Sequence, residues 1–317
     1  MKRDSATFAR REGSGSRRAG TERGDTISSR DNKWLKLFRA ALRGTGPRTG
    51  EAIGVEGPKF IEDALRSGLE ADALLVSESG ERHAAAVLRA ASESEAGIAR
   101  GRVLRTTDKL FEGVAGTDAP QGIAALFRQP EWSLEDVLRG AGTMRESAAL
   151  VIVLAEVQDP GNVGTALRSA EAFGATGAIA TRGTADPWSP KALRASAGSA
   201  LRLPVMRGLA IPILLAQLRM AGVKIHAARS APGAAVAYAG GAAGEISVQA
   251  DLREPAAIFV GSEGSGVPEQ VLHAADAIIS IPTSAAVESL NAGVAASIVL
   301  YEAARRRTEA ARTASEL

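Results

Sequence analysis

Short blocks of apolar residues separated by polar turns run through residues 33–130 and predict a first α/β domain. An apolar stripe at helical spacing over 34–42 predicts a helix that ends at the Gly44 loop. The other predicted helices span 59–67, 81–91 and 107–111, and the predicted strands span 51–56, 73–76, 102–105 and 123–127. Strands and helices that alternate at these lengths favour a compact domain of about 100 residues.

A longer succession of strands and helices fills residues 147–306 and predicts a second α/β domain with a mostly parallel sheet. The predicted strands span 148–155, 177–181, 223–228, 256–260 and 277–281, and the predicted helices span 164–174, 190–197, 211–221 and 290–304. The last two strands end abruptly in small and polar residues, as buried parallel strands do where they open into ligand-binding loops. The last helix repeats Val294, Ile298 and Tyr301 at the spacing of one helical face. We therefore expect a ligand pocket between these two strand ends and the start of that helix.

The remaining segments are poor in apolar residues. Residues 1–32 consist mainly of Arg, Gly, Ser and Thr and cannot bury enough surface to offset the entropy of ordering, so we expect a disordered tail. This tail holds eight basic and five acidic residues, a net charge of +3 in a chain whose formal net charge is +2. It is either a nonspecific phosphate-binding segment or a solvated tail without function. Residues 131–146 are expected to link the two domains, and residues 307–317 to form a C-terminal tail.

Composition excludes several kinds of chemistry. The chain has no cysteine, which excludes disulfides, thiolate catalysis and thiolate zinc sites. Its three histidines, His83, His226 and His273, are not spaced as ligand pairs, so we expect no metal site. No apolar run reaches the roughly 18 to 20 residues of a membrane helix, and the charged start lacks the apolar core of a secretory signal. We therefore expect a cytoplasmic protein with no membrane partner.

A polar cluster follows the predicted strand at 148–155. Asn162 stands where the next helix should begin, and its side chain could simply cap that helix. Capping accounts for Asn162 and Gly161 but not for Arg168, which lies in the second turn near the strand ends where an open α/β sheet binds ligands. A solvent-facing helix arginine is the alternative interpretation of Arg168.

A glycine-rich loop follows the predicted strand at 256–260. Gly261, Gly264 and Gly266 allow the backbone of this loop to approach a ligand closely. Its spacing is not the G-x-G-x-x-G of a dinucleotide-binding loop, and Pro268 follows too soon for a regular crossover helix. The loop therefore predicts a ligand site of another kind.

Three motifs occur in order along the second domain: N-x-G-x-x-x-R from Asn162 to Arg168, G-S-E-G-x-G from Gly261 to Gly266, and I-P followed by S-L-N from Ile281 to Asn291. In this order and spacing they resemble the motifs of the SpoU (TrmH) family of RNA ribose 2′-O-methyltransferases, in the SPOUT superfamily. The resemblance covers residues 147–306. In the first domain, V-E-G-P-K-F-I-E-D-A-L-R-S-G and T-D-A-P-Q-G-I look like the small substrate-binding domain, similar to RNA-binding ribosomal proteins, that many members carry.

The resemblance implies an α/β fold with a deep trefoil knot in the second domain and a homodimer. It implies methyl transfer without a metal from S-adenosylmethionine to a ribose 2′-hydroxyl of a structured RNA, with rRNA favoured over tRNA. The catalytic side chains that it implies are Asn162, Arg168, Glu263, Ser289 and Asn291. The cofactor-binding residues that it implies are Gly261, Ser262, Gly264, Ile281, Pro282 and Leu290.

Each implied catalytic residue has an expected role. In the family the motif-one arginine, here Arg168, has been proposed as the general base. A guanidinium rarely gives up its proton, so we favour a role in binding the phosphate next to the target ribose and in stabilising developing oxyanion charge. Asn162 and Asn291 are expected to orient the nucleophile and the loop, and Glu263 to brace the motif-two loop, with a pairing to Arg168 as one option. Ser289 either donates a hydrogen bond to the substrate or caps the last helix.

One departure from the family pattern follows Asn291. Family members often read S-L-N-V-S here, whereas this chain has Ala292 and Gly293, so a hydroxyl is missing. Ser289 and Leu290 remain, and we expect an active enzyme. The alternative is a noncatalytic RNA-binding or ribosome-assembly factor with the same fold, which would not need all the catalytic positions in place. A dinucleotide-dependent enzyme is a third interpretation, and it lacks its fingerprint.

Overall fold

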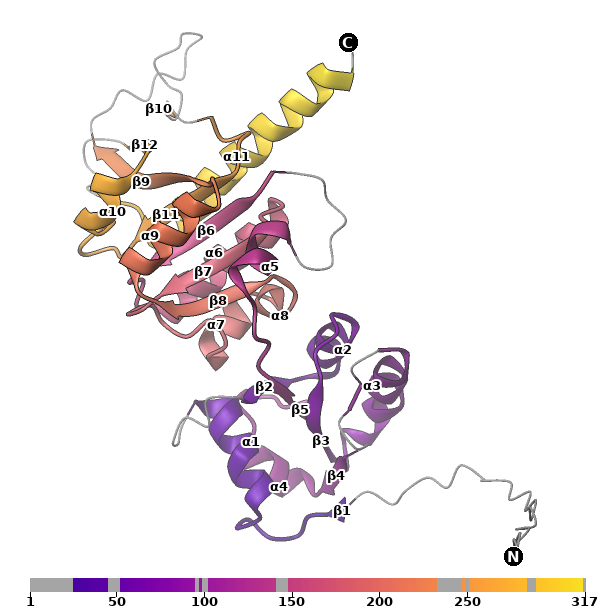
Figure 1. Ribbon diagram of the computed structural model, residues 1–317. Coiled ribbons are helices and arrows are strands. Elements are labelled where there is room, and N and C mark those ends of the chain that lie inside the picture. Colours follow the sequence, from indigo (N-terminus) through magenta and orange to yellow (C-terminus); the bar gives the residue numbers. More distant parts are fainter. Residues whose placement is uncertain are drawn as a thin grey trace, which may run out of the picture.

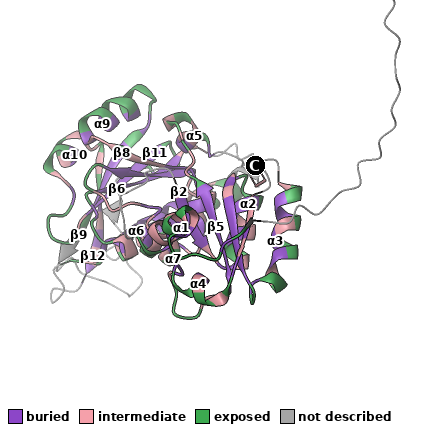
Figure 2. Ribbon diagram, turned by 90° about the horizontal axis from the view of Figure 1, so that it is seen from below, coloured by how far each residue is buried: buried purple, intermediate pink, exposed green. Residues whose placement is uncertain are grey.

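The computed structural model describes residues 25–44, 52–94, 97–98, 102–140, 148–232, 247–248, 251–283 and 289–315. These residues form two α/β units joined by a short crossing segment (Figure 1). In both units the strands are mostly buried, and the helices turn their exposed sides outward (Figure 2). The predicted α/β class, with a separate first domain, is confirmed.

The first domain is a five-stranded mixed sheet in the order β1-β4-β3-β5-β2. Its elements are β1 (Asp25–Thr26), α1 (Lys33–Arg43), β2 (Ala52–Glu56), α2 (Pro58–Arg66), β3 (Ala71–Ser77), α3 (Glu81–Glu93), β4 (Val103–Thr106), α4 (Asp108–Glu112) and β5 (Ile123–Arg128). Strands β1, β4 and β3 are parallel, and β5 runs antiparallel to β3 and β2. Helices α1 and α4 cover one face through Leu35, Phe38 and Phe111, and α2 and α3 cover the other through Ile61 and Val87.

The first domain begins earlier than the predicted boundary at residue 33. Strand β1 pairs with β4, and Ile27 is buried, with its backbone N–H donating to the Arg105 carbonyl oxygen at 2.7 Å. The Ile27 carbonyl oxygen accepts from the Thr106 hydroxyl at 3.1 Å. The expected tail of residues 1–32 therefore ends too late, because one apolar side chain anchors a polar segment to the sheet. Residues 1–24 lie outside the described part of the chain.

The second domain is a seven-stranded sheet in the order β10-β12-β9-β11-β6-β7-β8, in which β10 is the antiparallel strand. Its elements are α5 (Leu134–Arg139), β6 (Leu150–Ala155), α6 (Pro160–Ala172), β7 (Gly177–Thr181), α7 (Pro190–Ala195), α8 (Ser199–Arg202), β8 (Val205–Leu209), α9 (Ile211–Met220), β9 (Lys224–Pro232), β10 (Ser247–Val248), β11 (Ala256–Gly261), α10 (Glu269–Ala274), β12 (Ala277–Thr283) and α11 (Ala292–Ser315). Helices α5, α9 and α10 cover one face, and α6, α7, α8 and α11 cover the other. Strand β11 returns between β6 and β9, so the centre of the sheet is completed late in the chain.

Helices of the second domain extend beyond both of its predicted ends. The segment 131–146, expected as a linker, contains α5, and Val137 of α5 is buried so close to β7 that a Cβ at Gly177 would lie 2.7 Å from it. The segment 307–317, expected as a tail, continues α11 to Ser315. Strand β8 escapes a pattern-based prediction because Arg207 and Gly208 interrupt its apolar residues. Residues 141–147, 316 and 317 lie outside the described part of the chain.

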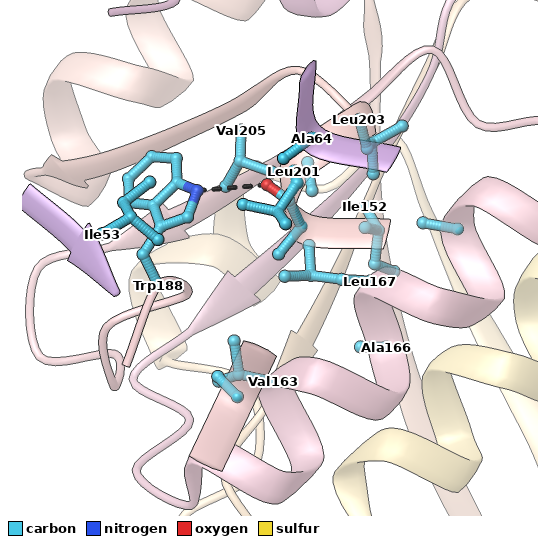
Figure 3. Packing of buried hydrophobic residues seen from close by; sticks show 14 of the residues in the cluster. Ile53, Ala64, Ile152, Val163, Ala166, Leu167, Trp188, Leu201, Leu203 and Val205 are labelled. Carbon is cyan, nitrogen blue, oxygen red and sulfur yellow. Dashed lines mark hydrogen bonds between the residues drawn. The ribbon is translucent and has the colours of Figure 1, made fainter. Parts of the chain in front are cut away.

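A shared apolar core joins the two domains. Ile53 of β2 and Ala64 of α2 belong to the same buried cluster as Trp188 and Leu201 of the second domain (Figure 3). The Trp188 indole N–H donates to the Ala200 carbonyl oxygen at 3.1 Å, which fixes the ring in this cluster. Because the contact is buried and apolar, separating the domains would expose it to water. The first domain is therefore held in one orientation relative to the second.

Helices α6 and α11 pack side by side through small residues. Gly293 faces Thr165, and a Cβ at position 293 would lie 3.0 Å from the Thr165 Cβ. One turn further along, the Ser169 and Ser297 hydroxyl oxygens are 2.6 Å apart. A serine at 293, which family members often have, would crowd Thr165. The glycine at 293 therefore matches the threonine on α6, which accounts for this departure from the family pattern by packing.

The apolar stripe of α11 that the sequence shows points outward. Val294 and Tyr301 are 44% and 55% exposed, and Ile298 is half-buried. The Tyr301 ring meets the Phe173 ring edge-on, with centroids 5.7 Å apart. The buried side of the helix is made of Ala292, Ala296, Val299, Leu300 and Ala303. Small residues thus let α11 lie close to α6 and the sheet, while larger apolar residues remain on the surface.

Arg307 fastens the second half of α11 to the starts of β6 and β11. Its guanidinium donates to the carbonyl oxygens of Leu252 at 2.7 Å, Glu254 at 2.9 Å and Ala149 at 3.0 Å, and also to that of Ala148. Burial lowers the pKa of Arg307. Carbonyl oxygens from two separate segments therefore stabilise this cation.

His226 of β9 is buried, and neither of its ring nitrogens has a hydrogen-bond partner among the described residues. Burial lowers the pKa of His226; the charge of Asp276 opposes this shift and that of Lys224 adds to it. The folded state therefore holds the imidazole neutral at pH values where an unfolded chain would protonate it.

We predict that Arg307→Ala lowers the free energy of unfolding by about 3 kcal/mol, because it removes four charge-assisted hydrogen bonds that hold α11 to the starts of β6 and β11, one of them to the carbonyl oxygen of the buried Leu252. Arg307→Lys should recover only part of this loss, since an ammonium cannot reach all the acceptors. Urea unfolding followed by circular dichroism measures both. Arg89→Ala, on the exposed side of α3, is the control and should change stability by less than about 0.5 kcal/mol. An Arg307→Ala protein as stable as that control would contradict the anchoring role.

We predict that His226 makes the protein less stable as the pH falls below about 6.5, the ordinary pKa of a histidine side chain. In that range the unfolded chain binds a proton that the folded protein does not bind, so the free energy of unfolding falls with pH, by on the order of 1 kcal/mol per pH unit. His226→Leu should lose this component of the pH dependence. Urea unfolding of both proteins at pH values on either side of 6.5 measures the difference, and equal slopes would refute the prediction.

Candidate active site

A cavity of about 500 Å³ opens at the carboxyl ends of β9, β11 and β12, beside the start of α11. Its volume is in the range of sites that enclose a drug-sized ligand, and its position is where open α/β sheets bind ligands. Apolar side chains, backbone of the loop after β11 and a few polar groups make up its walls. The pocket expected between two strand ends and a helix start is therefore present.

The loop after β11 has a shape that requires glycine. A Cβ at Gly261 would lie 1.9 Å from the Gly266 carbonyl oxygen, so no side chain fits there. Gly266 has a φ of 67°, a conformation that glycine adopts without strain. The Ser265 backbone N–H donates to the Ser262 Oγ at 3.2 Å, and the Gly266 N–H donates to the Ser262 carbonyl oxygen at 2.9 Å. The loop therefore presents its backbone to the cavity in one fixed shape.

Glu263, Asn162 and Asn291 form a hydrogen-bonded cluster beside the cavity, called here the amide–carboxylate cluster. The Asn162 amide donates to Glu263 Oε1. The Asn291 amide donates to Asn162 Oδ1 at 2.8 Å and to Glu263 Oε1 at 3.2 Å. The Ala292 backbone N–H donates to the same carboxylate oxygen at 3.5 Å. The cluster thus ties α6, the loop after β11 and the start of α11 to one another.

The capping interpretation of Asn162 is wrong. Helix α6 begins earlier, and its N-cap is Asp159, whose side chain accepts from the Gly161 N–H at 2.7 Å. Lys191 donates to the same carboxylate at 2.8 Å, and this hydrogen bond, with that from Gly161, lowers the pKa of Asp159. Asn162 lies one turn further on, is 8% exposed, and gives its amide to the amide–carboxylate cluster.

The capping option for Ser289 is also wrong. Asn291 caps α11, because its Oδ1 accepts from the Val294 backbone N–H at 3.2 Å. Asn291 therefore begins the helix and completes the amide–carboxylate cluster with one side chain. Ser289 is exposed and lines the cavity, which leaves it available to a ligand.

Arg168 of α6 takes no part in the amide–carboxylate cluster. It is exposed, and its side chain forms no ion pair within the described ranges of the chain. The option that Glu263 pairs with Arg168 is wrong, because Glu263 accepts hydrogen bonds from the two asparagines. Arg168 is therefore available to a group from outside this chain.

Five of the six residues expected to hold a cofactor line the cavity: Gly261, Ser262, Gly264, Ile281 and Leu290. Pro282 does not line it, because neighbouring side chains of a strand point to opposite faces and Ile281 faces the cavity. Arg229 also lines the cavity but is absent from the sequence-based set. One signal could have identified it. Its strand, β9, is parallel to β11 and β12, which precede the two motif loops, and all three strands end at the same edge of the sheet.

Two kinds of feature are absent from the described part of the chain. Among those residues, no three His, Asp or Glu side chains gather closely enough to hold a metal ion. No helix within them combines the length and apolarity needed to cross a bilayer.

Comparison with known proteins gives consistent matches over both domains. The SpoU rRNA Methylase family matches residues 149–301, and the MRM3-like substrate binding domain matches residues 48–125. The 23S rRNA (guanosine(2553)-2′-O)-methyltransferase RlmP of Bacillus subtilis is 32% identical over 248 residues, which are 78% of this chain and 86% of that protein. An uncharacterized tRNA/rRNA methyltransferase of Mycobacterium leprae is 31% identical over 92% of this chain and 96% of its own length.

A solved structure resembles most of the chain in its fold. The crystal structure of an AdoMet-bound rRNA methyltransferase from Sinorhizobium meliloti superposes with a TM-score of 0.71 and 26% identity, covering 89% of this chain and 97% of that one. The family match includes the strand ends, the glycine loop and the amide–carboxylate cluster described above. Sequence, fold and site therefore agree that the chain belongs to the SpoU rRNA methylase family.

Proposed function

We propose that this protein transfers a methyl group from S-adenosylmethionine to the 2′-hydroxyl of a ribose in rRNA. The amide–carboxylate cluster beside a cavity of about 500 Å³ is the observation that carries the proposal. Two names support it: the Bacillus subtilis relative is named as a 23S rRNA 2′-O-methyltransferase, and the Sinorhizobium meliloti structure is described as AdoMet-bound.

The cavity suits an adenosine that carries a short charged chain. Ile281 and Leu290 supply apolar walls for a base, and backbone groups of the loop at 261–266 can hydrogen-bond to its polar edge. The glycines of this loop leave no side chain between backbone and ligand. When bound, the cofactor supplies an electrophilic methyl group for in-line transfer.

The reaction requires that the hydroxyl be aligned and lose its proton. Asn162 and Asn291 hold Glu263, and through it the glycine loop, in one position. A loop fixed in this way keeps its backbone in place for the cofactor. Ser289 is exposed and lines the cavity, which supports a role in donating a hydrogen bond to the substrate. We assign these residues to alignment.

Arg168 is assigned to the RNA. Its guanidinium is exposed and unpaired within the described ranges, so it can bind the phosphate beside the target ribose with two parallel hydrogen bonds. The same cation stabilises the oxyanion that develops as the hydroxyl proton leaves. A role as proton acceptor is disfavoured, because a guanidinium holds its proton tightly.

We predict that Arg168→Lys lowers the single-turnover rate of rRNA methylation by on the order of 10²-fold, because an ammonium loses the bidentate contact. Cofactor affinity should stay unchanged, since Arg168 lies outside the cavity. Transfer of labelled methyl from S-adenosylmethionine to rRNA measures the rate, with Arg182→Lys as an exposed arginine control. A near-normal rate for Arg168→Lys would exclude the bidentate role. Wild-type protein that binds no cofactor would favour the noncatalytic RNA-binding factor.

We also propose a homodimer that forms through the outer face of α11. Val294 and Tyr301 are large exposed apolar residues on one face, and Ile298 lies between them. A contiguous exposed apolar patch on a helix is typical of an interaction surface. Phe173, at the end of α6, extends this patch next to Tyr301.

Tyr301→Glu should convert the dimer to monomer, because it places a charge in the centre of the proposed interface. Sedimentation velocity at micromolar concentration measures the mass. Met220→Glu, at an apolar position of α9 that is 89% exposed, is the matched control and should leave the dimer intact. A wild-type protein that sediments as a monomer would rule out the interface.

The knot is a further part of the proposal. Strand β11 returns between β6 and β9, β12 is added beyond β9, and α11 then packs on α6. This order supports the deep trefoil knot that the family resemblance implies. An experimental structure whose C-terminal segment passes through no loop would exclude the knot.

The first domain is proposed to bind the RNA substrate, as the match to a substrate binding domain supports. Its apolar contact with the second domain would hold the RNA at a fixed distance from the cavity. We further propose that the protein works in the cytoplasm, where rRNA is available. Cell fractionation that recovers the protein with membranes would argue against this location.

A further inference from the structure

We infer that Arg229 binds the carboxylate of the cofactor's methionine moiety and so fixes the direction in which the cofactor lies. This inference rests on the proposed function and adds a specificity-determining residue to it. Arg229 lies near the end of β9, immediately after Ala228, and both residues line the cavity.

The charges around the cavity carry this inference. Of the residues that line it, Arg229 and Glu263 are the two with charged side chains. The others are apolar residues, glycines and serines. A ligand that bears both signs of charge therefore meets one cation and one anion in the wall.

The two charges belong to different sides of the cavity. Glu263 is drawn toward α6 and α11 by hydrogen bonds from Asn162 and Asn291. Arg229 stands on β9 at the position paired with Ser280 of β12, so its side chain lies on the face of the sheet opposite to Ile281, the face that α9 and α10 cover. The wall thus has a negative group beside α6 and α11 and a positive group on the side of α9 and α10.

The Arg229 side chain stabilises no other part of the protein within the described ranges. It is exposed, and its guanidinium forms no ion pair there. Other arginines of this domain are fastened: Arg202 to Glu171 at 2.6 Å and Arg253 to Asp251 at 2.6 Å. An unpaired guanidinium in the wall of a ligand cavity is a donor for an anionic group of that ligand.

S-adenosylmethionine carries three charges at neutral pH: a carboxylate, an ammonium and the sulfonium. Its carboxylate matches Arg229, the cation of the wall, and its positive groups match the carboxylate of Glu263. The reverse orientation would bring carboxylate to carboxylate, which is repulsive. Arg229 therefore selects ligands that carry the amino-acid carboxylate over those that lack it.

The test compares cofactors that differ in this one group. Calorimetric titration of full-length wild type and Arg229→Gln uses S-adenosylmethionine, its decarboxylated form and 5′-methylthioadenosine. We expect Arg229→Gln to weaken S-adenosylmethionine binding on the order of tenfold and to leave the other two ligands unchanged. Arg229→Lys should restore part of the affinity. Arg182→Gln, an exposed arginine at the end of β7 outside the cavity, is the control and should bind all three normally.

Three results would overturn the inference. Equal weakening for the decarboxylated cofactor would show that Arg229 acts on the fold and not on the carboxylate. Unchanged S-adenosylmethionine affinity combined with weaker RNA binding would make Arg229 an RNA contact. If wild type bound none of the three ligands, the proposed function itself would fail, which differs from a failure confined to the Arg229→Gln variant.

Discussion

The amide–carboxylate cluster is the interaction on which the rest of the second domain depends. Glu263 stands 101 residues from Asn162 and 28 residues from Asn291, yet the three side chains meet at one point. There they join α6, the glycine loop after β11 and α11. Two amides and one carboxylate leave few unsatisfied donors and acceptors, so the cluster is stable beside the cavity.

Helix α11 is held at both ends, and this explains how a cavity can lie against it. At its start, Asn291 supplies both the cap and a hydrogen bond of the cluster. In its second half, Arg307 reaches carbonyl oxygens beside β6 and β11. Between these points Gly293 and Ser297 bring it close to α6. The large apolar residues are then left for the outer face, where they support the proposed dimer. The site and the proposed subunit contact thus both depend on where α11 lies.

Much of the fold could be predicted from the sequence, because apolar period and turn residues are local signals. The strand at 177–181 and the two strands that open into the motif loops are of this kind. The predicted domain boundaries differ from the observed ones where a single buried apolar residue attaches a polar segment to a domain. Ile27 draws a polar segment onto the sheet, and Val137 does the same within an expected linker. The order of strands is nonlocal, so no period in the sequence reveals that β11 lies between β6 and β9.

Of the candidate site, too, one part could be predicted from the sequence and another part needed the structure. The motif resemblance identified Asn162, Glu263 and Asn291, but the assignment of partners needed the structure, since a carboxylate has an equally reasonable partner in Arg168. Arg229 carries no motif, and only the parallel strands place it in the cavity. The sequence thus identifies the site residues that belong to motifs, and the structure adds Arg229, which only its position in the fold brings to the cavity.

A map of ribose methylation in rRNA tests the central claim most directly. Total rRNA would be compared from cells that contain the gene, cells that lack it, and cells that carry an Asn162→Ala copy, which breaks the amide–carboxylate cluster. The account predicts that a 2′-O-methyl group disappears without the gene, returns with the wild-type copy and stays absent with Asn162→Ala. An rRNA methylation map that is identical in all these cells would contradict it.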